Sequence, residues 1–164
     1  MGAKMRGLAV AVAVLAFIGW TSHGLREASG AEMYSKFTPN DIAEILRGLG
    51  YRAEVIIPEK GNPSIRSGMA GWDVLVFLYS CEPDGCMSLE YNLTVRKDPR
   101  FSLALLNTWN MEKRFAKTFL EKNGNITLSA DVYFNGGVSR DLIIWSARFF
   151  EDSAGSFLRT MSAK

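Results

Sequence analysis

Residues 72–96 read WDVLVFLYSCEPDGCMSLEYNLTVR, and this stretch decides the fold. Its first part, residues 72–80, is almost continuously apolar, which predicts a central strand buried on both faces. Its last part, residues 87–96, alternates between apolar and polar side chains, which predicts a strand with one face in the core. A turn bounded by Cys81 and Cys86 separates them. We therefore expect two neighbouring antiparallel strands joined by the cysteine turn.

The chain contains only these two cysteines. In an oxidising compartment they can close the small loop by a disulfide, and we expect a structural bridge between Cys81 and Cys86. A redox-active pair is the alternative. However, four residues separate the cysteines instead of two, and no helix N-terminus follows to lower the pKa of a thiol.

The N-terminus has the pattern of an export signal. Lys4 and Arg6 precede residues 8–20, a run without charge that is mostly apolar. A membrane-spanning helix needs about 20 apolar residues, so this run better fits the core of a secretory signal peptide. We expect a signal peptide of residues 1–31 and a mature domain of residues 32–164, without a membrane span, that is periplasmic or secreted. An uncleaved N-terminus that tethers the chain to the inner membrane is the alternative.

The predicted mature domain is electrically neutral. Three of the 19 basic residues and one of the 17 acidic residues precede residue 32, so 16 of each remain. Scattered charges with no net excess offer no electrostatic footprint for nucleic acid. The single histidine, His23, also lies in the predicted signal, which excludes imidazole catalysis and imidazole metal ligands from the mature domain. We expect no cofactor and no metal.

Helical and strand patterns continue on both sides of the cysteine turn. The predicted elements are a helix capped by Thr38, strands at residues 51–57, 64–67, 72–80 and 87–96, a helix at about residues 102–113, strands at residues 114–120 and 125–134, and a helix from Ser139 to about residue 161. The order α-β-β-β-β-α-β-β-α predicts a single α+β domain in which helices pack on an antiparallel sheet.

The helix at residues 102–113 carries a polar–aromatic motif. Asn107 and Asn110 flank Trp109. We expect the amides to fix the corner between helix and strand while Trp109 packs in the core. A polar ligand pocket beside an aromatic platform is the alternative. The side chains expected to point inward are Leu103, Leu106, Trp109 and Met111.

Three carboxylates are the remaining candidates for catalysis. Glu90, Asp131 and Asp73 lie at strand positions that could share one face of the sheet. Glu90 and Asp131 have Ser, Thr and Asn as neighbours on that face, which is typical of a solvated surface. An acid–base pair would require that one carboxylate be desolvated.

The last helix carries two apolar stripes. The first comprises Ile143, Ala147, Phe150, Ala154, Phe157 and Met161. The second comprises Leu142, Trp145 and Phe149. Two interpretations of the second stripe remain open: it widens the core face, or it forms a partner surface, in which case we expect a homodimer through this helix.

These landmarks together resemble the YbjN-like family, described as bacterial sensory-transduction regulators. The matching features are the loop of residues 81–86, residues 106–110, 114–116 and 123–125, Asp131, and residues 136–139. The likeness covers about residues 38–158 and implies a fold similar to that of type III secretion chaperones. The family has no established catalytic residues, so none are assigned.

Many members of this family look cytoplasmic, and the export signal is a departure from them. We therefore expect an exported, non-enzymatic domain with a regulatory or chaperone-like role in binding a protein whose identity the sequence does not indicate. The alternative is a cell-envelope enzyme or thiol-redox protein that uses carboxylates or the Cys81/Cys86 pair.

Overall fold

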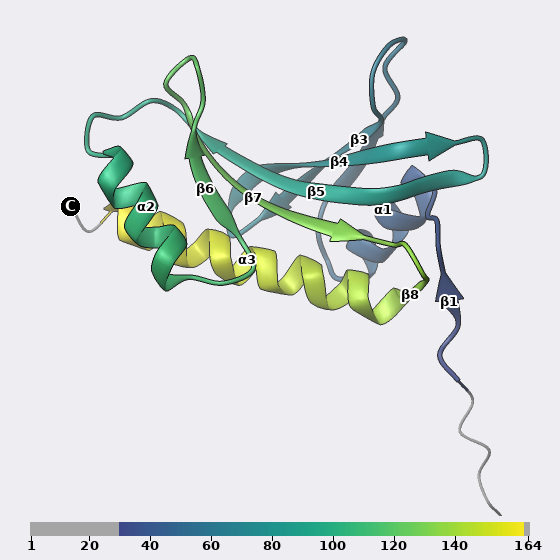
Figure 1. Cartoon of the computed structure of the whole chain (residues 1–164). Coiled ribbons are helices and arrows are strands. Elements are labelled where there is room, and N and C mark those ends of the chain that lie inside the picture. The colour runs from purple at the N-terminus through teal and green to yellow at the C-terminus, as the bar shows by residue number, and fades with distance from the viewer. Residues whose placement is uncertain (1–29, 163–164) are drawn as a thin grey trace, which may run out of the picture. The chain divides into compact units, whose positions relative to one another are not determined.

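In the part of the chain that the structure describes, three helices cover one face of a six-stranded antiparallel sheet (Figure 1). The structure, a computed structural model, describes residues 30–162, so the predicted signal peptide lies outside the described residues except for its last two positions. The elements are β1 (Met33–Tyr34), α1 (Pro39–Gly48), β2 (Ala53–Ile56), β3 (Ser64–Met69), β4 (Trp72–Glu82), β5 (Gly85–Val95), α2 (Leu103–Glu112), β6 (Lys117–Leu120), β7 (Ile126–Tyr133), β8 (Val138–Ser139) and α3 (Arg140–Ser162). The predicted α+β class and the order of the three helices and six main strands are confirmed.

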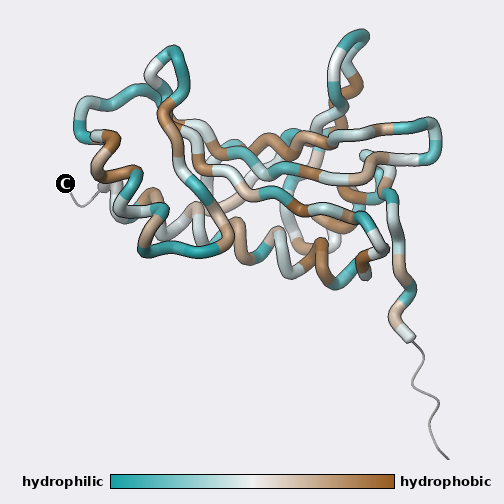
Figure 2. Tube along the Cα trace, in the orientation of Figure 1, coloured by the Kyte–Doolittle hydropathy of each residue, from teal (hydrophilic) through white to brown (hydrophobic). Residues whose placement is uncertain are grey.

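The cysteine hairpin lies at the centre of the sheet. The strand order is β2-β3-β4-β5-β7-β6, and each strand runs antiparallel to its neighbours. β4 and β5 are the longest strands, with 11 residues each. The turns between β4 and β5 and between β6 and β7 are hydrophilic, whereas hydrophobic residues occur along the strands and α3 (Figure 2).

A second, two-stranded sheet was not predicted. Met33 pairs with Ser139 and Tyr34 with Val138, which joins β1 to β8. Two residues are too few for an alternating pattern, so nothing in the local sequence indicates these strands. The pairing places the chain that leads into the domain beside the start of α3.

The helix that opens the main fold begins as predicted. The N–H of Asp41 donates to Thr38 Oγ1 at 3.2 Å, and the N–H of Thr38 donates to Asp41 Oδ2 at 2.8 Å. This reciprocal capping box satisfies backbone donors that a helix N-terminus leaves unpaired. The buried side of α1 consists of Ile42, Ala43, Ile45 and Leu46.

α3 crosses under the sheet and supplies much of the core. Five residues of the first predicted stripe are buried: Ile143, Ala147, Phe150, Ala154 and Phe157. The ring of Phe150 stacks on Tyr91 of β5, with 5.2 Å between the ring centroids. No helix within residues 30–162 is long and apolar enough to cross a membrane.

The prediction that β4 is buried on both faces is wrong. Val74, Val76 and Leu78 are buried on the side that the helices cover. The alternate residues of the strand are only half-buried: Leu75, Phe77 and Tyr79. Within residues 30–162, all three helices lie on the same side of the sheet, and none of them covers the other side, which we call the open face (Figure 1).

α2 also differs from its prediction. Leu106 and Trp109 are buried, but Leu103 is 68% exposed and Met111 is 79% exposed. This short helix packs beside the edge strand β6 at one end of the domain, so only one narrow side of it reaches the core (Figure 1). The strand expected to begin at residue 114 begins at Lys117.

Candidate functional site

An exposed apolar surface on α3 is the strongest candidate for a binding site. Leu142, Trp145 and Phe149 are 44%, 52% and 46% exposed. They lie on the side of α3 that faces away from the core. The side of α3 that packs in the core consists of residues of the first stripe. The structure therefore places this second stripe at the surface, and its role in partner binding stays a prediction.

Phe115 extends this surface from the loop between α2 and β6. Its ring stacks on Phe149, with 5.4 Å between centroids and 15° between planes, yet Phe115 is 66% exposed. Its backbone φ of 70° lies in the left-handed region, which costs a non-glycine residue about 1 kcal/mol or more. We call Phe115, Leu142, Trp145 and Phe149 the aromatic patch. The pattern of residues 114–120 predicts a continuous strand and therefore did not place Phe115 on a surface beside the last helix.

Two arginines lie over the rings of the aromatic patch. The guanidinium carbon of Arg148 is 5.5 Å from the ring centroid of Trp145, and that of Arg114 is 5.1 Å from the centroid of Phe115. Cations over aromatic faces are attracted by the ring quadrupole. Aromatic residues together with arginine are also the side chains that contribute most binding energy in protein interfaces. The patch can therefore bind an apolar protein surface that has carboxylates at its margin.

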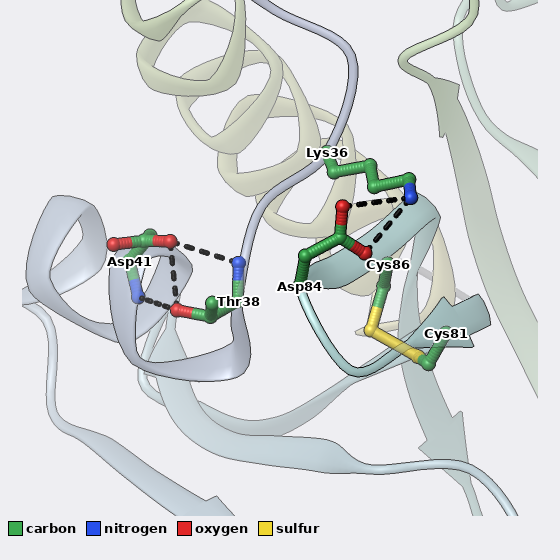
Figure 3. Close-up of a disulfide and its surroundings, with 6 residues drawn as sticks. All are labelled: Lys36, Thr38, Asp41, Cys81, Asp84 and Cys86. Carbon is green, nitrogen blue, oxygen red and sulfur yellow. Dashed lines mark hydrogen bonds and ion pairs between the residues drawn. A yellow bond between two sulfur atoms is a disulfide. The ribbon is translucent and has the colours of Figure 1, made fainter.

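The second candidate site, the cysteine pair, is a disulfide across the turn between β4 and β5 (Figure 3). Cys81 and Cys86 are directly opposite in the strand register. Cys86 is buried, and its backbone exchanges two hydrogen bonds with Phe37: Phe37 N–H donates at 3.1 Å and Cys86 N–H donates at 2.9 Å. Both cysteines lie on strands, so neither has the helix N-terminus that activates redox thiols. The geometry is that of a structural bridge.

Ion pairs and a close backbone approach hold the turn between β4 and β5 against the segment that precedes α1. Lys36 Nζ donates to Glu82 at 2.5 Å and to the carboxylate oxygens of Asp84 at 2.8 and 2.9 Å (Figure 3 shows the bonds to Asp84). These bonds, first that to Asp84, raise the pKa of Lys36 above its ordinary value. Gly85 has a φ of +139°, and a Cβ there would lie 3.0 Å from the carbonyl carbon of Phe37, so only glycine fits this close approach.

Asn110 joins α2 to the sheet, whereas Asn107 does not. Asn110 Nδ2 donates to the Thr118 carbonyl at 3.0 Å, and the N–H of Thr118 donates to Asn110 Oδ1 at 2.7 Å. The amide thereby makes the two hydrogen bonds that a further strand would make to the edge strand β6. The Asn107 amide instead donates to the sulfur of Met111 at 3.5 Å. Of the two asparagines, only Asn110 fixes the predicted corner, where the Thr118 hydroxyl also lies 3.1 Å from the Leu106 carbonyl.

Trp109 lies in the core and not on a ligand platform. It is buried, and its ring meets that of Phe157 edge-to-face, with 5.4 Å between centroids. A hollow of about 420 Å³ between α2 and β6 is lined by Asn107 and Asn110 but not by Trp109. The alternative of a polar pocket beside an aromatic platform is therefore wrong.

The candidate carboxylates share the open face of the sheet. Glu90 of β5 lies directly opposite Asp131 of β7. The Tyr79 hydroxyl donates to Glu90 Oε2 at 2.9 Å, and Lys117 Nζ donates to Asp131 Oδ2 at 3.0 Å. Asp73 lies near the start of β4 and pairs with an arginine of the loop before β2.

The electrostatics of this face do not suit an acid–base pair. Burial, with the bond to Glu90 as the second cause, raises the pKa of Tyr79 to about 12. The bond to Asp131 raises the pKa of Lys117 above its ordinary value. Both donors therefore stay protonated near neutral pH, and each carboxylate already accepts a hydrogen bond on an uncovered face. Within residues 30–162, no three His, Cys, Asp or Glu residues are grouped so that they could hold a metal ion.

Fold and site together define a class: a small α+β domain with helices on one face of an antiparallel sheet and a disulfide-closed central hairpin. A family model, YbjN, described as "Putative bacterial sensory transduction regulator", matches residues 38–163. The chain belongs to the YbjN family, which is described by regulation and not by a catalysed reaction.

A solved structure agrees with this fold. The chain is similar to the crystal structure of YbjN from E. coli, described as "a putative transcription regulator", with a TM-score of 0.62 and 14% sequence identity. The match covers 80% of this chain and 95% of that one. A search of curated proteins found no match.

Proposed function

We propose that this chain is an exported, non-enzymatic regulatory domain that binds a protein through the aromatic patch. The observation that carries the proposal is Phe115, which adopts a left-handed backbone and stacks on Phe149 while two-thirds of it stays exposed to solvent. Exposure of a large apolar ring gains nothing for folding, and strained backbone is concentrated at functional sites. A partner surface that covers the ring would explain both features.

The chemistry of the domain supports binding over catalysis. The disulfide occupies both cysteines, and the carboxylates of the open face accept hydrogen bonds from Tyr79 and Lys117. The mature domain would have equal numbers of acidic and basic residues, which favours a protein partner over nucleic acid. The family description as regulators points in the same direction.

We place the mature protein in the periplasm or outside the cell. The short apolar run at residues 8–20 and the disulfide across the turn between β4 and β5 both suit an exported protein. The test is the intact mass and N-terminal sequence of protein from an osmotic-shock fraction, where we expect a chain that starts near Glu32. Recovery of only the full-length chain, in membranes, would refute cleavage and support a tether.

Chemical cross-linking in intact cells tests the binding role. The chain offers a matched pair of tryptophans, because Trp145 is 52% exposed in the patch and Trp72 is 48% exposed at the start of β4. We expect cross-linked protein, identified by mass spectrometry, that is lost in Trp145→Glu and retained in Trp72→Glu. If the same products form with all three proteins, the aromatic patch is not the binding surface.

A further inference from the structure

We propose that the partner at the aromatic patch is a second copy of this chain, which packs antiparallel on α3 about a two-fold axis beside Trp145. This inference rests on the proposed function, because it names the protein that the patch binds. Three observations carry it: the charges at the two ends of the patch, its apolar area and the protruding ring of Phe115.

The charges along α3 are self-complementary. Asp141 lies four residues before Trp145, and Arg148 lies three residues after it; both are exposed. Within residues 30–162, neither side chain forms an ion pair. In an antiparallel pair centred on Trp145, Asp141 of one copy is level with residue 149 of the other, about 1.5 Å along the axis from Arg148. The pair therefore forms two equivalent Asp141–Arg148 contacts between copies.

The same arrangement covers the apolar residues. Leu142 of one copy comes level with Arg148 and Phe149 of the other, and the two Trp145 rings meet at the axis. Large aromatic side chains bury about 150–250 Å² each, and the four patch residues are about half exposed. The patch thus offers on the order of 400–500 Å² of apolar surface per copy. Two copies approach the area of a stable interface, about 1,200–2,000 Å² in total, once a polar rim is included.

A second copy of the chain has a complementary apolar surface by symmetry, whereas any other partner would need a separate surface that matches the aromatic patch. An isologous dimer brings two identical apolar surfaces together, so each aromatic patch meets a surface of equal size and hydrophobicity. Phe115 projects from the loop beside α3 and, through its stack on Phe149, widens the surface at the end of the patch remote from Leu142. Arg114 lies over the outer ring and places a positive charge at that margin.

A charge-swap experiment tests the geometry. Sedimentation equilibrium of the purified, disulfide-intact protein should show a mass that rises from one chain to two over the micromolar range. Asp141→Arg and Arg148→Asp each create two repulsive contacts, and each should weaken the dimer about tenfold or more. An equimolar mixture of the two variants restores opposite charges at both contacts, so it should form a heterodimer as tight as the wild type.

Replacement of an apolar side chain by a charged one provides the second test of the dimer. Trp145→Glu should abolish association, and Trp72→Glu, at a similarly exposed tryptophan outside the patch, should leave it unchanged. Far-UV circular dichroism and thermal unfolding show whether each variant is folded. If Trp145→Glu does not fold, the charge-swap mixture decides, because neither of its variants removes an apolar side chain.

Three results would overturn the inference: wild type that stays monomeric at several hundred micromolar, a dimer that persists in folded Trp145→Glu, or a charge-swap mixture that stays monomeric. A monomeric wild type that still forms Trp145-dependent cross-links to another protein rejects the second copy but leaves the proposed function intact. A monomeric wild type without such cross-links rejects both.

Discussion

Replacement of Asn110 tests how the edge of the sheet is stabilised. Its amide donates to the carbonyl of Thr118 and accepts from the N–H of Thr118, and the Thr118 hydroxyl lies 3.1 Å from the same amide oxygen. Asn110→Ala removes the hydrogen-bond partner of both the N–H and the carbonyl of Thr118, a residue that is only 4% exposed. A buried polar group left without a partner costs about 1–3 kcal/mol, so we expect a loss of about 2–4 kcal/mol in the free energy of unfolding.

The chain supplies a matched control three residues away. The Asn107 amide reaches only the sulfur of Met111, a weak acceptor, and both side chains are exposed. Asn107→Ala should therefore change stability by about 0.5 kcal/mol or less. Asn110→Asp should fall between the two alanine variants, because it keeps the acceptor for the Thr118 N–H but sets a carboxylate oxygen against the Thr118 carbonyl.

Urea unfolding followed by tryptophan fluorescence measures these differences. With a slope of about 2 kcal/mol per molar urea, a loss of about 3 kcal/mol lowers the midpoint by about 1.5 M. If Asn110→Ala and Asn107→Ala unfold at the same midpoint, with equal slopes, the amide does not stabilise β6.

Three further predictions concern other bonds. Thiol titration of unfolded, unreduced protein should find no free thiol, and joint replacement of Cys81 and Cys86 by Ser should lower the free energy of unfolding by about 2 kcal/mol; two free thiols would contradict the bridge. Tyr51→Phe removes a 2.6 Å hydrogen bond to Glu151 and should lower the free energy of unfolding in urea by about 1 kcal/mol; an unchanged urea midpoint would contradict this. Burial raises the pKa of Tyr79 to about 12, above the value near 10 of an exposed tyrosine. The folded state therefore favours the protonated hydroxyl, and its contribution to the free energy of unfolding is complete below pH 10 and is lost as the pH rises towards 12. Thermal unfolding between pH 8 and 11.5 should therefore decline less steeply for Tyr79→Phe than for wild type, and equal slopes would refute this.

The sequence by itself determined the elements of the fold and their order. The alternation at residues 87–96 assigned the inward side of β5 correctly, including buried Leu89, Tyr91 and Leu93. The strands predicted at residues 114–120 and 125–134 are neighbours, β6 and β7, and the turn between them contains Asn123 and Gly124, with Gly124 at a φ of +88°. These features depend on backbone preferences and on side chains within a few residues, so they can be predicted from a single sequence.

The candidate binding surface was predictable only in part. The spacing of Leu142, Trp145 and Phe149 identified a second stripe on α3, but periodicity gave no means to choose between core and solvent. Phe115 and Arg114 entered only through the family resemblance, as part of residues 114–116, and no pattern in the sequence indicated that they or Arg148 belong to a binding surface. Phe115 reaches Phe149 because a loop far away in sequence passes beside α3, and phenylalanine rarely adopts the left-handed backbone found there.

Only the tertiary structure decided which apolar faces are covered. Residues 72–80 are apolar at almost every position, so their pattern does not distinguish the covered face of β4 from its open face, where Phe77 and Tyr79 remain half-buried. Leu103 and Met111 likewise look like core residues in sequence but project from the narrow end of the domain. Coverage depends on where segments distant in the chain pack, and the three helices of residues 30–162 all pack on the same side of the sheet. Local periodicity specifies how a strand or helix forms, whereas burial requires a partner layer that only the complete fold supplies.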